Sequence, residues 1–597
     1  MNLQISARLE ALRREMNEAG ISACIINGSD PHLSEYVPTR WESRAFISGF
    51  TGSYGWLAVT QTEAALWTDS RYFIQAADEL EGTTIQLMKA RVPDSVFVGD
   101  WIAMQLEPGQ TVAFDGDCFS LAECMLLQKA FEPKALKIES RYDLLDPIWD
   151  DRPSFPSGKA FIHPVERAGA SCREKITAIA EEMLKKGAGI SLLTALDDIC
   201  WTFNIRGTDV PFNPVVMAFA AIESSGKVTL FIDKQKFEQA DLYELKKQGI
   251  SVLPYNFFTS YLLGLNGSTI LIDPSRTNFS TWQCIRENNK IINDISIPQL
   301  LKSVKNEVEI EGMKQAAILD GLALLNFQLW LEKAIRNEPV TEWDIRLKLA
   351  EFRSKMIGYK GESFYPVVGY NDHGAVVHLH ITPQSAYTLA PEGMLLIDSG
   401  GHYEFGTTDI TRTIALGPVS EQMQVDFTLA LKGLIALSDI RFPRGTLGCH
   451  LTVLAHRALW MNYCNYGHGT SHGVGAYLNV HEGPQSIRFD LTNQPLLPGM
   501  VLSNEPGLYR EGQWGVRTEN LMVCVEDTHS QFGSFLRFET ITMYPIDTTL
   551  IDLTLLDKAE KEWINEYNKV VFETLEPLAN FKQLRLLDRL TKPVDYD

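Results

Sequence analysis

The 597-residue sequence has no long apolar run, no CxxC pair and no excess of basic charge. No stretch approaches the roughly 18 apolar residues that a membrane-spanning helix requires, so a membrane protein is not expected. The first twenty residues, MNLQISARLEALRREMNEAG, mix Arg and Glu and lack an apolar h-region. They do not resemble a signal peptide, and Ile5, Leu9, Leu12 and Met16 instead predict one face of an amphipathic helix.

Cysteine and charge narrow the class of protein further. The nine cysteines are odd in number and dispersed. This usage argues against a disulfide framework and predicts a cytoplasmic protein. A net charge of −21 disfavours nucleic acid as a partner. Of the twelve histidines, ten lie after residue 370, so catalytic chemistry is expected in the C-terminal half.

The first half of the chain contains two similar patterns of helices and short strands. The segments ALWTDSRYFIQA and TLFIDKQKFEQA end the two patterns in the same way. Asp69, Phe73, Gln75 and Ala76 match Asp233, Phe237, Gln239 and Ala240 in spacing. We therefore predict two related small α/β domains that arose by duplication, rather than a chance likeness between common patterns.

Two boundaries are indicated by composition and by helix signals. The Pro/Ser/Gly-rich stretch DDRPSFPSGK predicts a first boundary near residue 155. A long run of helix formers, NEVEIEGMKQAAILDGLALLNFQLWLEKAI, follows a second boundary near residue 302. The predicted domains are residues 1–155 and 156–302, both α/β, and residues 303–597, of mixed α/β and α+β character with a helical C-terminal extension.

Four carboxylates and one imidazole stand at or beside predicted strand ends in the third segment. They are Asp398 in LLIDSG, Asp409 in GTTDITRT, His472 in GHGTSHGVG, Glu505 in SNEPG and Glu519 in VRTEN. Gathered in one site, four carboxylates would repel one another strongly without cations. Oxygen ligands with one imidazole suit Mn²⁺, Co²⁺ or Zn²⁺, and five ligands exceed what one catalytic zinc normally uses. The set therefore predicts a two-metal site. Taken singly, each residue has a simpler interpretation as a turn residue or helix cap.

The order D-x10-D, GHGxxHGxG, NEPG and RxEN resembles the metallopeptidases of the pita-bread fold, which include methionine aminopeptidase, prolidase and aminopeptidase P. The stretch GHGTSHGVGAYLNVHEGP is similar to the signature of aminopeptidase P. The likeness extends into the first half through RAFISGFTGS and WTFNIRGTDVPFNPV. The chain as a whole looks most like the long, three-domain, cytosolic Xaa-Pro aminopeptidases.

The resemblance implies roles for individual residues. Asp398 and Asp409 would hold one metal, and Asp409, His472, Glu505 and Glu519 the other, with Asp409 and Glu519 bridging. His378, His468 and His481 match the family's active-site histidines, Arg517 an arginine beside the metals, and Tyr509 a tyrosine lining the site. Alternation along AVVHLH would put His378 and His380 on one strand face, so only the resemblance selects His378.

The implied activity is hydrolysis of the bond between an N-terminal residue and a following proline, by a hydroxide that bridges two metals. The metals would most simply be Mn²⁺, with Co²⁺ or Zn²⁺ as alternatives. Glu505 would move the proton, and His378 and His481 would donate to the developing oxyanion. Substrates would be peptides with proline second, and the family pairs as homodimers.

Three other functions are consistent with parts of the pattern. A prolidase shares all five ligands but cleaves free Xaa-Pro dipeptides. Methionine aminopeptidases lack the two preceding α/β domains. Relatives that lost their metals bind protein partners, but such a chain should have broken ligands, and all five are present here.

Overall fold

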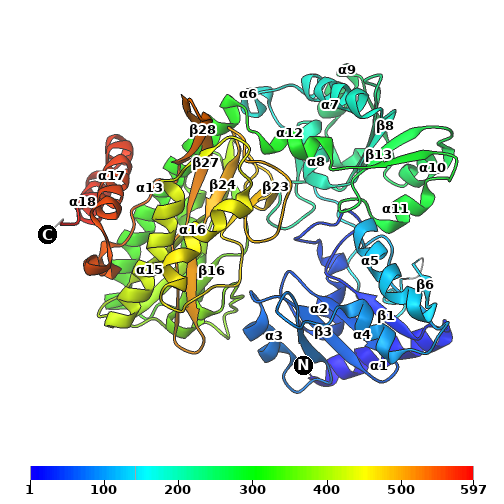
Figure 1. Cartoon of the computed structure of the whole chain (residues 1–597), viewed down its shortest axis with the longest axis horizontal. Helices are drawn as coiled ribbons and strands as arrows, with labels where there is room; N and C mark the ends of the chain where they lie inside the picture. The colour runs from blue at the N-terminus through cyan, green and yellow to red at the C-terminus, as the bar shows by residue number, and fades with distance from the viewer. Residues whose placement is uncertain (1, 141–142, 596–597) are drawn as a thin grey trace. The chain divides into compact units, whose positions relative to one another are not determined.

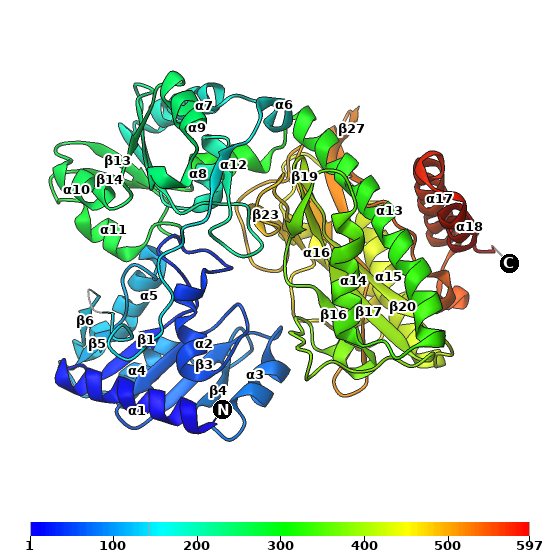
Figure 2. The same cartoon turned by 180° about the vertical axis from the view of Figure 1, so that it is seen from behind.

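The computed structural model describes residues 2–140 and 143–595, which divide into two compact units. The first unit runs to Val165 and resumes over Ala170–Leu301; the second comprises Glu166–Gly169 and Lys302–Asp597. In Figures 1 and 2 the first unit is coloured from blue to green, and the second from green to red apart from the cyan segment Glu166–Gly169. None of the helices in the described ranges combines the length and apolar character that crossing a bilayer requires. The boundaries at residues 155 and 302 stay predictions.

The first unit begins with a six-stranded sheet of order β4-β3-β2-β1-β5-β6. Strand β1 pairs antiparallel with β2 and parallel with β5. The N-terminal helix α1 (Asn2–Glu18) buries Ile5, Leu9, Leu12 and Met16, as its periodicity predicted. The strands are β1 (Ala23–Ile26), β2 (Trp56–Thr60), β3 (Ala64–Thr68), β4 (Gln86–Lys89), β5 (Thr111–Ala113) and β6 (Lys137–Glu139), and the other helices are α2 (Ser43–Ser48), α3 (Phe73–Leu80), α4 (Val98–Gln105) and α5 (Leu121–Phe131).

A second six-stranded sheet, of order β12-β11-β10-β8-β13-β14, repeats this topology. In each sheet the second and third strand pairs along the order given are antiparallel: β3–β2 and β2–β1 in the first sheet, β11–β10 and β10–β8 in the second. The other three pairs in each sheet are parallel. The predicted duplication is therefore confirmed at the level of strand order and strand direction. The strands are β8 (Ile190–Leu193), β10 (Phe219–Glu223), β11 (Val228–Phe231), β12 (Ile250–Leu253), β13 (Thr269–Ile272) and β14 (Lys290–Asn293), and the helices are α7 (Cys172–Lys186), α8 (Leu196–Thr202), α9 (Gln239–Lys247), α10 (Phe257–Gly264), α11 (Phe279–Cys284) and α12 (Ile297–Ser303).

The matched sequence segments occupy equivalent places in the two sheets. ALWTDSRYFIQA forms β3 and the start of α3, and TLFIDKQKFEQA forms β11 and the start of α9. Asp69 and Asp233 both follow a buried strand and accept hydrogen bonds from backbone N–H groups two residues ahead. This local turn lets each chain leave its strand and enter the helix that follows.

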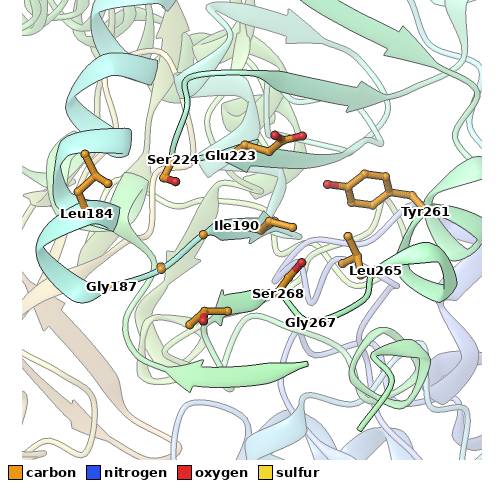
Figure 3. A pocket seen from close by; sticks show the side chains of 12 residues that line it. Leu184, Gly187, Ile190, Glu223, Ser224, Tyr261, Leu265, Gly267 and Ser268 are labelled. Carbon is orange, nitrogen blue, oxygen red and sulfur yellow. The ribbon is translucent and has the colours of Figure 1, made fainter. Parts of the chain in front are cut away.

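An open surface pocket of about 680 Å³ lies in the second half of the first unit (Figure 3). It lies at the starts of β8 and β13, beside the end of β10. Ile190, Leu265 and the ring of Tyr261 supply apolar walls, and Glu223 and Ser268 supply polar groups.

A buried histidine joins the two halves of the first unit. The ring of His32, which follows β1, lies within hydrogen-bond distance of Thr194 O through Nδ1 (2.7 Å) and of Tyr255 Oη through Nε2 (2.8 Å). A carbonyl can only accept, so Nδ1 carries the proton and Nε2 accepts from the tyrosine. Burial lowers the pKa of His32 to about 4, so the ring is neutral at neutral pH.

We expect His32 to make folding sensitive to acid. The unfolded ring takes up a proton near pH 6.5, whereas the folded ring resists protonation until about pH 4. The contribution to stability is therefore complete above pH 6.5 and falls by about 3 kcal/mol as the pH drops to 4. Urea unfolding of the unsubstituted chain and of His32→Gln, compared at pH 7, 5.5 and 4, measures the contribution of His32 to the free energy of unfolding. An unchanged difference between the two proteins across this range would contradict it.

The second unit opens with the long helix α13 (Glu307–Asn337), which the sequence predicted. A capping box starts it, in which Asn306 accepts from the backbone of Glu309 and the Glu309 carboxylate accepts in return. The remaining helices are α6 (Val165–Ala168), α14 (Glu342–Ser354), α15 (Glu421–Ser438), α16 (Gly448–Trp460), α17 (Lys558–Leu575) and α18 (Phe581–Leu590).

Short sheets lie beside these helices (Figure 1), and β25 and β26 form a two-stranded ribbon. One sheet has the order β16-β17-β20, another β15-β18-β19, and a larger one β21-β28-β27-β24-β22-β23. The strands are β15 (Tyr359–Glu362), β16 (Val367–Tyr370), β17 (Met394–Ser399), β18 (Gly401–Tyr403), β19 (Gly406–Thr407), β20 (Ile410–Ala415), β21 (Arg441–Pro443), β22 (Ser471–Gly473), β23 (Glu482–Ile487), β24 (Val501–Asn504), β25 (Gly507–Arg510), β26 (Trp514–Arg517), β27 (Asn520–Ser530) and β28 (Gly533–Thr540), and small strands β7 (Ala160–Ile162) and β9 (Ile205–Gly207) pair in the first unit.

The prediction that AVVHLH forms a strand is wrong. Residues Asn371–Ala375 form a 3₁₀ turn, and the chain continues in turns through His378. Val376 N donates to His373 O and Leu379 N to Val376 O, so the backbone groups that a strand would offer to a neighbour are used locally. Alternation along a strand therefore does not relate His378 to His380; His380 is exposed and its ring packs on Tyr365.

Candidate metal centre

The structure brings the five predicted ligands to adjoining strand ends of the second unit. Asp398 lies in β17, and Asp409 just precedes β20, which pairs with β17. His472 lies in β22, Glu505 follows β24, and Glu519 lies between β26 and β27. Apolar residues before Asp398 and Glu505 build the buried strands β17 and β24, so these two side chains stand where their strands end.

Three of the five side chains form a compact set of donor atoms. One ligand atom each from Asp409, His472 and Glu519 lie within 4.8 Å of one another. His472 Nε2 is 3.5 Å from Asp409 Oδ2 and 3.4 Å from Glu505 Oε1. Asp398 Oδ2 accepts from Arg517 Nη2 at 2.7 Å, which leaves its other oxygen for a further partner.

The carboxylates raise one another's pKa because they share a buried space. Burial, together with repulsion from Asp409, raises the pKa of Glu505 to about 7 and that of Asp398 above its usual range. Burial and repulsion from Asp409, Glu505 and Asp398 raise the pKa of Glu519 well above its usual value. Burial alone would lower the pKa of His472, but Asp409 and Glu505 raise it to about 9. The cluster is therefore strongly in need of positive charge.

The donor set fits divalent cations. Asp398 Oδ1 and Glu519 Oε1 are fully buried and have no hydrogen-bond partner within the described ranges. Such orphaned oxygens are costly unless something else satisfies them. His472 Nδ1 donates to Gly473 O at 2.9 Å, which fixes the tautomer and leaves Nε2 to face the carboxylates. Unsatisfied carboxylate oxygens and an oriented imidazole are the features expected of a site built for metals.

A hydrogen-bonded chain runs from Asp398 to His468. Arg517 donates from Nη2 to Asp398 and from Nη1 to Tyr509 Oη, the latter at 2.6 Å. Tyr509 Oη in turn lies 2.8 Å from His468 Nε2, and His468 Nδ1 lies 2.8 Å from Gly469 O. Because the carbonyl and the arginine fix both ends, the tyrosine donates to His468, whose proton is on Nδ1. The predicted site residues Arg517, Tyr509 and His468 are therefore linked to the predicted ligand Asp398.

The other two predicted histidines lie near the same residues. The ring of His481 packs edge-on against His472, with centroids 4.4 Å apart. His378 lies in the loop after Asn371–Ala375, and the neighbouring Val377 O is 3.4 Å from Arg517 Nη2. Nine of the ten predicted site residues therefore form one connected set around Arg517 and the carboxylate cluster, and the backbone beside the tenth, His378, reaches Arg517.

Sequence reasoning missed several residues that hold this site. Thr411 Oγ1 donates to Glu519 Oε2 at 2.8 Å, and Ser503 Oγ donates to Glu505 Oε1 at 3.1 Å. Asp426 of α15 accepts from Arg510 and Trp514, which fixes the β25–β26 ribbon that carries Tyr509 and Arg517. Thr411 and Ser503 could have been found from the sequence, because they lie within two residues of Asp409 and Glu505 in TDITRT and SNEPG. Nothing in the sequence around Asp426 indicates its role.

Family models match almost the whole chain in sequence. Two creatinase/prolidase N-terminal domains match residues 8–145 and 151–309. Metallopeptidase family M24 matches residues 311–526, and the C-terminal region of peptidase M24 matches residues 534–594. The five ligand positions all fall within the M24 match.

Relatives match the chain along nearly its whole length. Aminopeptidase P2 of Arabidopsis thaliana is 37% identical and Xaa-Pro aminopeptidase 1 of Dictyostelium discoideum 35% identical, over 96% and 99% of this chain and 86% and 97% of theirs. The crystal structure of an X-prolyl aminopeptidase from Caenorhabditis elegans, described as a cytosolic enzyme with a di-nuclear active site, superposes with a TM-score of 0.94 at 32% identity, covering 99% of this chain and all of that one.

The matched domains define a metallopeptidase of family M24 with two creatinase-type N-terminal domains. Within that class, the chain belongs to the Xaa-Pro aminopeptidase family. The predicted fold class, two related α/β domains before a pita-bread domain, is confirmed.

Proposed function

We propose that this protein is a metal-dependent Xaa-Pro aminopeptidase that hydrolyses the bond between an N-terminal residue and a following proline. The observation that carries the proposal is the intact cluster of four carboxylates and one imidazole, in a chain related to Xaa-Pro aminopeptidases over its whole length. A binding protein without metals would have no use for four carboxylates that share one site and repel one another.

We infer that two divalent cations are held by Asp398, Asp409, His472, Glu505 and Glu519, with Asp409 and Glu519 shared. Bound cations would polarise the scissile carbonyl and make water acidic enough to attack it near neutral pH. Mn²⁺ is our preferred ion, because the donors are mostly oxygen; Co²⁺ and Zn²⁺ are alternatives. One ligand atom each from Asp409, Glu519 and His472 lie within 4.8 Å of one another, which supports a shared role for the two carboxylates.

The chain's own residues would move the proton and support the charge. Glu505, 3.4 Å from His472 Nε2 at the edge of the cluster, can accept a proton from water and pass it to the proline nitrogen that leaves. His378 and His481 would donate to the oxygen that becomes negative, while His468 and Tyr509 line the wall of the site. Proline lacks an N–H, so a site that does not rely on strand-like hydrogen bonds to the substrate suits it.

Three further properties are proposals. The protein would act in the cytoplasm, which agrees with nine free cysteines among the described residues. Its domains would be residues 1–155, 156–302 and 303–597. It would form a homodimer, for which the exposed and stacked rings of Trp460 and Phe489 on the second unit offer an apolar contact surface. Light scattering should give twice the 67.1 kDa chain mass, and a mass of one chain would contradict the dimer.

One assay separates the proposed activity from its alternatives. The purified chain is given Xaa-Pro-Yaa, Xaa-Pro and Met-Ala-Yaa peptides, with Mn²⁺ and after treatment with a chelator. Mn²⁺-dependent release of Xaa from the first peptide, with little cleavage of the others, is the expected result. Cleavage mainly of the dipeptide would indicate a prolidase with two extra domains, and no cleavage would favour a binding protein.

A further inference from the structure

A buried arginine lies directly behind the carboxylate cluster. Arg412 belongs to β20, three residues after Asp409, and only 5% of its surface is exposed. Among the described residues its side chain has no carboxylate hydrogen-bond partner; the guanidinium instead donates to six neutral oxygens of the second unit. Five N–H hydrogens serve six acceptors, so every donor is used.

The acceptors connect the cluster to distant parts of the chain. Nη1 donates to the main-chain oxygen of Glu519 at 2.6 Å, and Nη2 donates to Asn520 Oδ1 at 2.8 Å. The same Nη2 donates to Tyr544 O at 2.6 Å, and Nε donates to Pro545 O at 2.9 Å. Arg412 therefore ties the strand of Asp409 to the peptide of Glu519 and to the segment that leads into the C-terminal helices.

Helix α17 contacts Arg412 through one hydroxyl group, that of Tyr567. Tyr567 Oη lies 2.9 Å from Arg412 Nη2 and accepts from it. It then donates towards Tyr544 O at 2.8 Å, with Thr542 O and Asn520 Oδ1 also within 3.3 Å. The hydroxyl is buried and 155 residues distant in sequence from the arginine that it contacts.

We propose that Arg412 is a positioning residue for the metal centre, and that helix α17 supports the site because its Tyr567 holds Arg412 in place. This inference rests on the proposed function, because Arg412 acts only through the ligands Asp409 and Glu519. A carboxylate can hold both of its oxygens in position for a metal only if the backbone of its own residue stays in place. The planar fork of an arginine can hold several carbonyls at once, whereas a lysine offers a single point charge.

The test measures cation binding directly, with Co²⁺ alone as the probe. The full chain is stripped with chelator, and Co²⁺ affinity is measured by calorimetry together with the visible absorption of bound Co²⁺. Arg412→Lys should weaken binding by about 10- to 100-fold and change the absorption spectrum, as expected for groups that orient metal ligands. Tyr567→Phe, which removes only the hydroxyl, should weaken it by about 3- to 10-fold.

The matched control is Tyr370→Phe. It removes a hydroxyl that donates to Glu392 O at 3.0 Å in the same unit, away from Arg412. It should lower the melting temperature as Tyr567→Phe does but leave Co²⁺ affinity within about twofold. If Tyr567 acts through Arg412, adding Tyr567→Phe to Arg412→Lys should weaken binding no further.

The outcomes distinguish this inference from the function on which it rests. Unchanged affinity and spectrum in Arg412→Lys or Tyr567→Phe, with a lowered melting temperature, would overturn the inference and leave a purely structural role. Fully additive effects in the double variant would overturn the coupling through Arg412. Failure of the unsubstituted chain to bind Co²⁺ would overturn the proposed metal centre itself.

Discussion

Replacing Asp409 with asparagine is expected to lower kcat/KM by more than about 1,000-fold and to raise the stability of the metal-free protein. Asp409 lies beside both His472 and Glu519, and its charge raises the pKa of Asp398, Glu505 and Glu519. It is the carboxylate whose loss most weakens the site for cations. The amide keeps the size of the side chain but supplies no negative charge.

The gain in stability has the same physical cause as the loss of activity. Without cations, Asp409 is repelled by three carboxylates and attracted by His472, so removing its charge is expected to lower the energy of the folded state. A relief of about 1 kcal/mol would raise the melting temperature of the metal-free second unit, which has about 300 residues, by about 1–2 °C. With Mn²⁺ present, the unsubstituted protein should have the higher melting temperature, because only its site gains stability from binding the cations.

Elemental analysis, peptide assays and melting curves with and without Mn²⁺ check this prediction. Asp439→Asn removes an exposed carboxylate from the same unit and should change none of the three. Full activity and two bound metals in Asp409→Asn would show that the site does not depend on this residue. A lower melting temperature in the metal-free variant would show that the carboxylates are not in net repulsion.

The residues that the sequence could predict are those whose role follows from local pattern. Asp398 and Glu505 follow the apolar residues of GMLLIDSG and VLSNEPG, and Asp409 and Glu519 stand beside strand boundaries, so all four positions can be recognised along the sequence itself. The duplication could be predicted for the same reason, because β3 with α3 and β11 with α9 repeat one local arrangement. Both inferences need only neighbours along the chain.

What could not be predicted depends on contacts between distant segments. The His32–Tyr255 and Arg412–Tyr567 contacts join residues 223 and 155 positions apart. AVVHLH has the apolar composition of a strand, yet Gly374 packs so closely on Gly515 of the ribbon that a Cβ there would contact its backbone at 3.2 Å. That tertiary contact accompanies the turns around His378, and composition alone contains no sign of it.

Arg517→Lys is expected to lower kcat/KM by about 100-fold while the protein keeps its fold. The buried guanidinium joins Asp398 and Tyr509, and it also reaches Thr411 Oγ1 at 3.2 Å and Val377 O beside His378. A lysine keeps the charge that compensates Asp398 but cannot make these directed bonds together. The loss of about 3 kcal/mol corresponds to the expected change in rate.

The direction of the effect follows from what each bond holds. Without the bond from Arg517, Tyr509 is free to donate elsewhere, and His468 loses its fixed partner. The change should appear mainly in kcat, because the ligands of the cations are all retained. Arg457→Lys, on an exposed face of α16, is the matched control. If Arg517→Lys lowered bound metal as strongly as activity, the arginine would serve the cations through Asp398 rather than the geometry of the histidines and tyrosine around them.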